Sequence, residues 1–224
     1  MASTNLSGRR VLVTAGPTRE HLDPVRFVSN PSTGKMGMAV AHAARALGAE
    51  VTVVLGPVGP LEREGVEVVD VTSAEQMRDA VLARVPGVDC LVAAAAVSDY
   101  RPVSCSPRKL KKVEGPETVT FVRTPDVLAE ASRAVAGLAH RPLLVGFAAE
   151  THDVLENARG KLRRKGLDAI VANDLTAPGA GFGVDTNEVT VLLKGGAVHP
   201  LRGTKREVAE ALWAVLVPML GGAC

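Results

Sequence analysis

The sequence predicts an α/β protein with a Rossmann-like, mostly parallel sheet that helices flank on both faces. Short β-branched apolar runs alternate along the chain with segments of helical periodicity. Such a β-α-β order favours parallel strands joined by crossover helices. The chain has 224 residues, enough for one large domain. We therefore expect residues 1–224 to form a single domain.

The first half of the chain alternates strands and helices. β-branched residues predict a strand over residues 10–15. The apolar stripe that follows predicts a helix that Ser32 caps and Gly48 ends. Ser73 and Gln76 have the spacing of a capping box, which opens the next helix. Further strands are expected over residues 51–55, 66–71 and 89–94.

An irregular segment over residues 95–116 interrupts this alternation. A long non-periodic stretch inside a compact domain is usually a functional loop. After it, a strand is expected over residues 118–123, and Thr124 is expected to cap a helix with Pro125 at its first position. Gly166 would end the helix after that. The remaining elements of this part are a strand at 143–148, a helix at 154–165 and a strand at 168–172.

The C-terminal part predicts an antiparallel hairpin over residues 186–203. Strand-like runs at 188–193 and 198–201 flank a turn that contains two adjacent glycines. Thr204 and Glu207 then form a second capping box for a last helix. We expect the hairpin at the edge of the sheet, where it is a candidate for dimerisation.

Composition excludes several classes of function. A net charge of +2 gives no general attraction to nucleic acid or membranes, and 3% aromatic residues leave few stacking platforms for single strands. Five histidines without i, i+4 pairing disfavour a transition-metal site built by the protein. Three cysteines without a Cys-x-x-Cys pattern favour a reducing compartment. Neither a signal core nor a membrane-spanning run is present, so we expect a cytoplasmic protein.

The strand-to-helix loops should meet at one edge of the sheet. Right-handed crossovers place these loops on the same side, and ligands of such sheets bind outside the carboxyl ends of the strands. The loops concerned are residues 16–34, 93–112, 124–126 and 147–151.

The segment before the first helix is rich in groups that bind anions. Gly34 and Lys35 lie where a helix start leaves N–H groups unpaired and carries the positive end of the dipole. Arg26 can donate two hydrogen bonds to a phosphate or carboxylate. The amide of Asn30 suits a position where charge develops on an acyl oxygen. Phosphate or carboxylate binding is our first hypothesis, and the alternative is that Asn30 and Ser32 only cap the helix.

This loop lacks two common phosphate-binding motifs. No Gly-x-Gly-x-x-Gly turn follows the strand directly, as a dinucleotide fold requires, and Gly34-Lys35 is not followed by Ser or Thr, as in a Walker A loop. An NAD(P)-binding oxidoreductase is therefore disfavoured, although the sheet would allow it. A non-catalytic nucleotide-binding module is a further alternative.

Two stretches after the central strands could contact a nucleotide. Small residues at 93–96 would let a ligand approach backbone N–H and C=O groups closely, and Asp99 could hold ribose hydroxyls or a metal-bound phosphate. Phe147 could offer its face to a base, although a place in the core is the commoner fate of phenylalanine.

Several lysines could neutralise phosphates. Three of them at 109–112 suit a triphosphate on a mobile loop, and a solvated basic loop is the alternative. Lys161 and Lys165 are four residues apart on one helical face, so they could meet phosphates together or face solvent.

Together these segments resemble the phosphopantothenate–cysteine ligase family, and more narrowly its bacterial, CTP-using branch. The resemblance covers most of residues 11–174. It implies that the carboxylate of 4′-phosphopantothenate attacks the α-phosphate of CTP, and that the amine of L-cysteine then attacks the acyl-cytidylate and releases CMP. The matching stretches, in order, are TAGPTREHLDPVRFVSNPSTGKMG, AAAAVSDYRP, KLKK, RTPDVL, VGFAAET and KLRRKGLDAIVAND.

The resemblance also implies a role for each candidate residue. Asn30, Lys109 and Arg26 would be catalytic, Lys109 acting on the triphosphate and in the second half-reaction. Arg26, Asn30, Gly34 and Lys35 would bind phosphopantothenate. Besides Lys109, CTP would contact Ala93, Ala94, Ala95, Asp99, Pro125, Asp126, Val127, Leu128, Phe147, Lys161 and Lys165.

The cofactors and partners follow from the same resemblance. Mg²⁺ would accompany CTP, and no metal site made by the protein alone is expected. Many bacterial relatives carry a flavin-dependent decarboxylase ahead of this domain; it is not in these 224 residues, so no flavin is expected. The family is dimeric, which implies a homodimer with its active site near the partner chain. Eukaryotic relatives can use ATP, so the preference for CTP is inherited from the bacterial resemblance.

Overall fold

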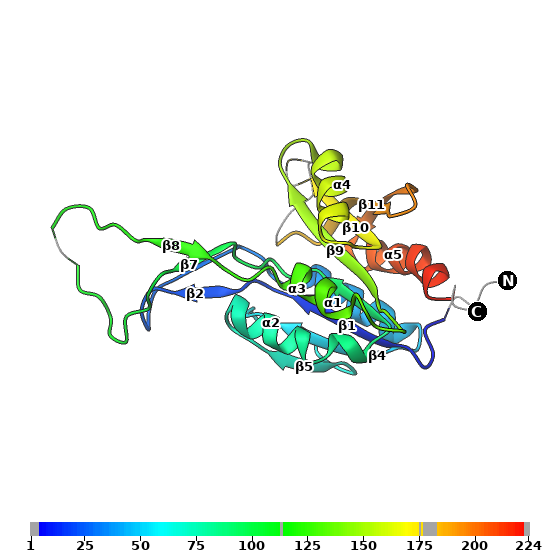
Figure 1. Ribbon diagram of the computed structural model, residues 1–224, viewed down its shortest axis with the longest axis horizontal. Helices are drawn as coiled ribbons and strands as arrows, with labels where there is room; N and C mark the ends of the chain where they lie inside the picture. The colour runs from blue at the N-terminus through cyan, green and yellow to red at the C-terminus, as the bar shows by residue number, and fades with distance from the viewer. Residues whose placement is uncertain (1–4, 113, 175, 177–182, 222–224) are drawn as a thin grey trace.

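The fold is an α/β structure around one eight-stranded sheet (Figure 1). The computed structural model describes residues 5–112, 114–174, 176 and 183–221, so one of the three cysteines, Cys224, lies outside the described residues. The strand order is β12-β11-β10-β9-β6-β1-β4-β5, and the six strands from β10 to β5 are mutually parallel. This confirms the predicted fold class. The strands are β1 (Arg10–Ala15), β4 (Glu50–Leu55), β5 (Glu67–Asp70), β6 (Cys90–Ala93), β9 (Leu143–Glu150), β10 (Ala169–Asp174), β11 (Thr186–Leu193) and β12 (Val198–Thr204).

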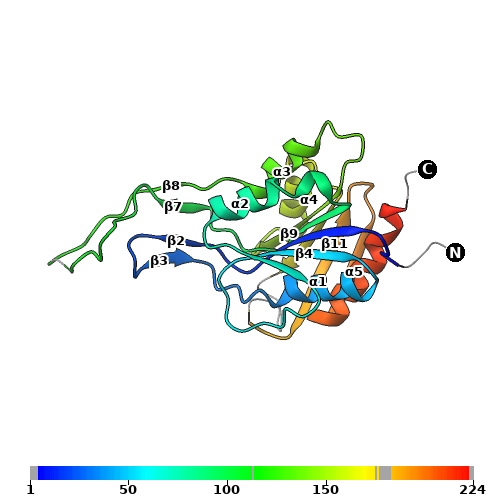
Figure 2. The ribbon, with the colours of Figure 1, turned by 90° about the horizontal axis from the view of Figure 1, so that it is seen from below.

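Helices cover both faces of the sheet, as predicted. Figure 2 shows α2, α3 and α4 above the sheet and α1 and α5 below it. Side chains alternate along β1, so that Val11 and Val13 pack on the α1 and α5 side and Leu12 packs on the other side. The helices are α1 (Lys35–Ala46), α2 (Ala74–Leu82), α3 (Val127–Val135), α4 (Val154–Arg164) and α5 (Lys205–Leu220), with a short 3₁₀ helix, η1, at Val85–Gly87.

Two predicted helix caps are confirmed and two are wrong. The capping boxes at Ser73 and Thr204 are both present. At α1, however, the residue before the helix is Gly34 with a φ of 75°, not Ser32. At α3 the cap is Asp126, whose side chain accepts from the Ala129 N–H. Thr124 does not cap α3; its hydroxyl donates to a backbone carbonyl, that of Ser98.

Two short hairpins form an arm that sequence periodicity did not reveal. β2 (Arg19–His21) pairs with β3 (Phe27–Ser29), and β7 (Tyr100–Pro102) pairs with β8 (Phe121–Arg123). β2 also packs against β7, and both views show the arm extending away from the sheet (Figures 1 and 2). The strand predicted over 118–123 is therefore shorter and lies outside the main sheet. Three-residue strands are too short to show an alternating pattern.

The predicted C-terminal hairpin is confirmed at the edge of the sheet. β11 pairs antiparallel with β10 and with β12, and β12 is the edge strand. Gly196 has a φ of 93° in the turn, which a residue with a side chain rarely adopts. Among the described residues, none of the helices combines the length and the apolar character that crossing a membrane requires.

Gly37 allows α1 to lie directly against β1. A Cβ atom at this position would be 2.5 Å from the Cβ of Ala15 and 3.1 Å from its Cα. We expect Gly37→Ala to lower the free energy of unfolding by about 1–2 kcal/mol, because overpacking outweighs the better helix propensity of alanine. Urea unfolding of both proteins measures this difference.

Gly59→Ala is the matched control for that substitution. A Cβ atom on Gly59 would meet nothing within 4 Å. If Gly37→Ala and Gly59→Ala unfold at the same urea concentration, the close approach of α1 to β1 is not limiting for stability.

Candidate functional site

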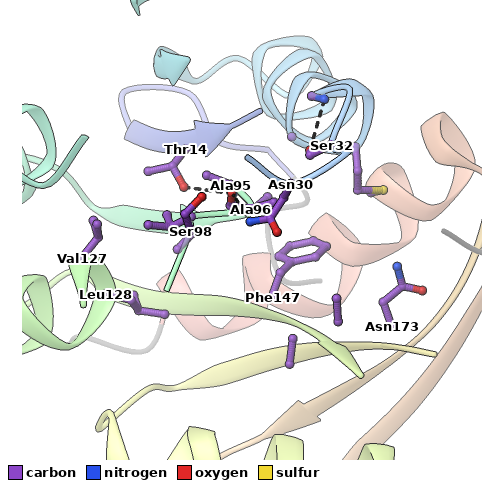
Figure 3. A pocket seen from close by; sticks show the side chains of 18 of the residues that line it. Thr14, Asn30, Ser32, Ala95, Ala96, Ser98, Val127, Leu128, Phe147 and Asn173 are labelled. Carbon is purple, nitrogen blue, oxygen red and sulfur yellow. Dashed lines mark hydrogen bonds between the residues drawn. The ribbon is translucent and has the colours of Figure 1, made fainter. Parts of the chain in front are cut away.

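A cavity of about 720 Å³ lies at the carboxyl ends of the central strands (Figure 3). This volume is within the usual range of small-molecule sites. Its walls come from the end of β1, the start of α1, the segment after β6, the start of α3, the middle of β9, α4, the end of β10 and the starts of β11 and α5. The parallel strands therefore bring together loops that are far apart in the sequence, as their predicted arrangement required.

The start of α1 forms one wall of the cavity. Gly34, Lys35, Met36 and Gly37 all line it. Among the described residues, no side chain caps this helix start. The first N–H groups of a helix have no carbonyl partner within the helix and attract anions. This wall is therefore suited to a phosphate or carboxylate group.

Asn30 is held in place by the segment after β6. Its Nδ2 donates to the carbonyl oxygen of Ala96 at 3.0 Å, which fixes the orientation of the amide. The amide oxygen then points away from Ala96 on the side of Phe147 (Figure 3). The alternative that Asn30 and Ser32 only cap the helix is wrong, because the helix begins after Gly34.

The alanines after β6 contact the end of β1 and Gly16, the residue that follows it, through their backbone. The N–H of Ala94 donates to the carbonyl of Thr14 at 3.1 Å, and the N–H of Ala95 donates to the Thr14 hydroxyl at 3.2 Å. The N–H of Ala96 donates to Gly16 at 2.9 Å. These N–H groups therefore hold the cavity floor together in this structure, and the small side chains leave space above it.

Lys161 on α4 and Lys165, the C-terminal cap of α4, are together called the lysines of α4, and both line the cavity with acidic partners. Lys161 Nζ is 2.7 Å from a Glu150 oxygen, and Lys165 Nζ is 2.8 Å from Asp126 Oδ1. Burial raises the pKa of Asp126, but its hydrogen bonds with Lys165 and with the Ala129 N–H more than compensate, so the pKa lies below the usual range. Asp126 is consequently a stable anion that positions Lys165 at the cavity.

The lining carries an excess of positive charge. Among the described residues, its acidic side chains are those of Asp99 and Asp126. Such a balance favours a ligand with several negative charges. The basic side chains of the lining are Lys35, Arg123, Lys161, Lys165 and Lys205.

Most of the candidate residues from the sequence meet at this cavity. Two do not, Arg26 and Lys109, which lie in the arm. The candidates that line the cavity are Asn30, Gly34, Lys35, Ala93, Ala94, Ala95, Asp99, Pro125, Asp126, Val127, Leu128, Phe147, Lys161 and Lys165.

Arg26 and Lys109 are part of the arm instead of the cavity lining. Arg26 binds the fully buried carboxylate of Asp23 at 2.6 Å and the carbonyl of Leu110 at 2.9 Å. The N–H of Leu110 also donates to Asp23, so this carboxylate ties the loop after β7 to the β2–β3 turn. The side chain of Lys109 is exposed. The arm carries both residues away from the sheet edge because the strands of each hairpin pair with one another and not with the main sheet.

Sequence reasoning did not assign several polar residues of the cavity lining to the site. Ser98 Oγ and Asn173 Oδ1 are buried and have no hydrogen-bond partner among the described residues, which suits a ligand contact. A usable sequence signal existed for Asn173, a polar residue at the end of an apolar strand. The missed polar residues are Thr14, Ser98, Tyr100, Arg123, Thr124, Asn173, Asn187 and Lys205.

The fold and the site define the class of protein as a Rossmann-like α/β domain with a basic pocket at the carboxyl edge of its sheet. A family model narrows this class. The chain belongs to the family described as the DNA/pantothenate metabolism flavoprotein C-terminal domain, whose model matches residues 6–219.

Individual relatives agree with this family. The chain is 47% identical over 227 residues to the coenzyme A biosynthesis bifunctional protein CoaBC of Mycobacterium tuberculosis, covering 97% of this chain and 54% of the relative. It is 48% identical over 195 residues to CoaBC of Bacillus subtilis, covering 87% and 47%. The chain thus spans about half the length of the curated relatives it matches. A crystal structure of the C-terminal domain of CoaBC is 39% identical, with a TM-score of 0.81 over 99% of this chain and 100% of that one.

Proposed function

We propose that this chain is a phosphopantothenate–cysteine ligase domain of coenzyme A biosynthesis, and that CTP activates its substrate acid. The observation that carries the proposal is the cavity itself: stretches by which the sequence resembles this family meet there, around an oriented Asn30 and an excess of basic side chains. The relatives named CoaBC, at 47–48% identity, support the same pathway.

The reaction has two steps that such a cavity can host. A carboxylate oxygen of 4′-phosphopantothenate attacks the α-phosphorus of CTP, and pyrophosphate leaves. The amine of L-cysteine then attacks the acyl carbon of the mixed anhydride, and CMP leaves with the bonding electrons while the amine loses a proton. Holding two anionic reactants together is the main requirement, because their mutual repulsion and lost freedom oppose the first step.

The residues of this chain divide the work by position. The start of α1 with Lys35 binds an anionic group, and Lys161 and Lys165 offset phosphate charge from α4. Asn30 donates its second amide N–H to the oxygen on which charge develops. Phe147 offers its ring to the base.

Magnesium would accompany the triphosphate. Among the described residues, no cluster of three or more His, Cys, Asp or Glu side chains could hold a metal ion alone. Mg²⁺ in phosphoryl-transfer sites needs only one or two carboxylates beside the substrate phosphates, and Asp99 is exposed at the cavity. The lining therefore fits a magnesium ion that the nucleotide brings, which would neutralise phosphate charge.

A homodimer would explain why Arg26 and Lys109 lie away from the cavity of their own chain. The arm exposes Val25, Phe27 and Phe121, which are 40–57% exposed to solvent. Clustered exposed apolar side chains often mark an interface. The arm is thus a second candidate for the dimer contact beside the 186–203 hairpin, and it would bring Arg26 and Lys109 near the partner chain.

Incubation with CTP, 4′-phosphopantothenate and Mg²⁺ tests the proposed activity. We expect pyrophosphate release that requires the acid, and amide formation when L-cysteine is added. Hydride transfer with NAD(P), or CTP binding without turnover, would refute the ligase and favour the oxidoreductase or the binding module.

A thermal-shift series with the four nucleoside triphosphates would test the preference for CTP, because tighter ligands stabilise the folded state more.

A further inference from the structure

Lys205 is a buried lysine at the first position of α5, on the wall of the cavity. It is 8% exposed, and its ammonium group donates to the backbone carbonyl of Val184. From the sequence, we expected the residues around Lys205 to form only the edge hairpin and the last helix. The structure places the Lys205 side chain at the cavity as well.

The position of Lys205 is unfavourable for a cation in two ways. A helix start carries the positive end of the dipole, where acidic side chains are preferred. Burial of an ammonium group is costly unless a partner compensates for it. The pKa of Lys205 is accordingly lowered, first by burial and then by the nearby charge of Lys35, with Asp185 acting in the opposite direction.

The charge near Lys205 is only partly compensated. Lys35 Nζ is 2.7 Å from Asp185 Oδ1, and the side chain of Asp185 is 85% exposed, so solvent screens it. The lysines of α4 differ, because Lys161 and Lys165 each contact a separate carboxylate. The two lysines at the starts of α1 and α5 therefore share one screened carboxylate.

These two helix starts belong to the same corner of the cavity. α1 and α5 pack against each other, and both Lys35 and Lys205 line the cavity. Asn187 of β11 is 4% exposed, and its amide lies 3.7 Å from the Met36 sulfur, which joins β11 to the start of α1. An anion at this corner would meet two ammonium groups and the free N–H groups of α1.

We infer that Lys205 and Lys35 together bind a terminal phosphate group of a substrate, so that α5 completes the site. The inference rests on the proposed function for the identity of the ligand. Two substrates carry such a group: the triphosphate of CTP and the 4′-phosphate of phosphopantothenate. Burial of the Lys205 ammonium group is unfavourable in the free protein, and contact with a phosphate in the complex would compensate for it.

Calorimetry on Lys205→Met tests the inference with four ligands. These are CTP, CMP, 4′-phosphopantothenate and pantothenate. We expect either CTP or 4′-phosphopantothenate to bind about 10- to 100-fold more weakly, since a hydrogen bond to a charged group is lost. The matching ligand, CMP without the β- and γ-phosphates or pantothenate without the 4′-phosphate, should bind unchanged. Loss for CTP assigns the corner to the triphosphate, and loss for phosphopantothenate assigns it to the 4′-phosphate.

Lys194→Met is the matched control, because Lys194 is exposed in the turn of the β11–β12 hairpin, which directly precedes Lys205. We expect Lys205→Met to be at least as thermally stable as the unmodified protein, because a buried charge is removed. Lys205→Gln serves as a second variant if the methionine variant does not fold. Unchanged affinity for both CTP and 4′-phosphopantothenate would overturn the inference.

The failure of this inference can be told apart from the failure of the proposed function. A protein that releases pyrophosphate normally while Lys205→Met binds both ligands unchanged would remove only the role of Lys205. A protein that binds phosphorylated ligands through Lys205 but never releases pyrophosphate would remove only the ligase.

Discussion

Replacing Asn30 by alanine is expected to lower the rate of amide formation about 10²- to 10³-fold, the usual loss for one donor to a developing oxyanion. The amide of Asn30 is already oriented by its 3.0 Å hydrogen bond to Ala96. The side chain of Asn30 therefore does not have to reorient when charge develops on the reacting oxygen. CTP should still bind, because Phe147 and the lysines of α4 are unchanged.

Asn157→Ala is a close control for this experiment. The Nδ2 of Asn157 also donates to a backbone carbonyl, that of His152, at 3.0 Å, but this residue is not part of the cavity lining. Both variants lose one such hydrogen bond, so both should lose a similar, small amount of stability. Steady-state kinetics and CTP calorimetry on the two variants would separate chemistry from folding. A normal rate for Asn30→Ala would exclude Asn30 from the reaction.

Replacing Trp213 by alanine is expected to lower the free energy of unfolding by about 3–5 kcal/mol, the range for deleting a large buried aromatic side chain. Trp213 lies on α5 and is fully buried. Its indole N–H donates to the carbonyl of Val40 on α1 at 2.9 Å. The alanine variant leaves a cavity between the two helices and loses the hydrogen bond of the indole N–H.

Chemical unfolding monitored by far-UV circular dichroism measures this loss. Trp213→Phe keeps much of the volume and removes the N–H, so it should fall between the alanine variant and the unmodified protein. Arg206→Ala, at a position on α5 whose side chain is 85% exposed, should change stability little. Equal unfolding midpoints for Trp213→Ala and Arg206→Ala would mean that the contact between α5 and α1 contributes little to the fold.

Much of the fold followed from local patterns in the sequence. Apolar alternation and helical stripes depend on neighbouring residues alone, and they placed the eight main strands and the five helices. The capping boxes at Ser73 and Thr204 also depend on residues three apart, and both are present. The caps of α1 and α3 did not follow in this way, because several candidate residues precede each helix and the backbone path selects one of them.

The candidate site was predictable where the topology rule applies. Parallel strands end at the same edge, so the loops after β1, β6 and β9 had to meet, and Asn30, Asp99 and Phe147 line one cavity as a result. Arg26 and Lys109 were expected there too. Instead they lie in two hairpins whose strands pair within each hairpin, outside the main sheet, and three-residue strands leave no local pattern that reveals this.

The amino-acid sequence by itself determined the fold class, the family resemblance and most of the residues around the cavity, because periodicity and motifs depend only on residues that are close together in the chain. Only the tertiary structure decided that the arm leaves the sheet edge and that Asn187 and Lys205 reach the cavity. The place of Asn187 depends on β11 pairing with β10, and that of Lys205 depends on α5 packing back against α1. Such packing is set by the summed contacts of the whole core, which no single segment contains.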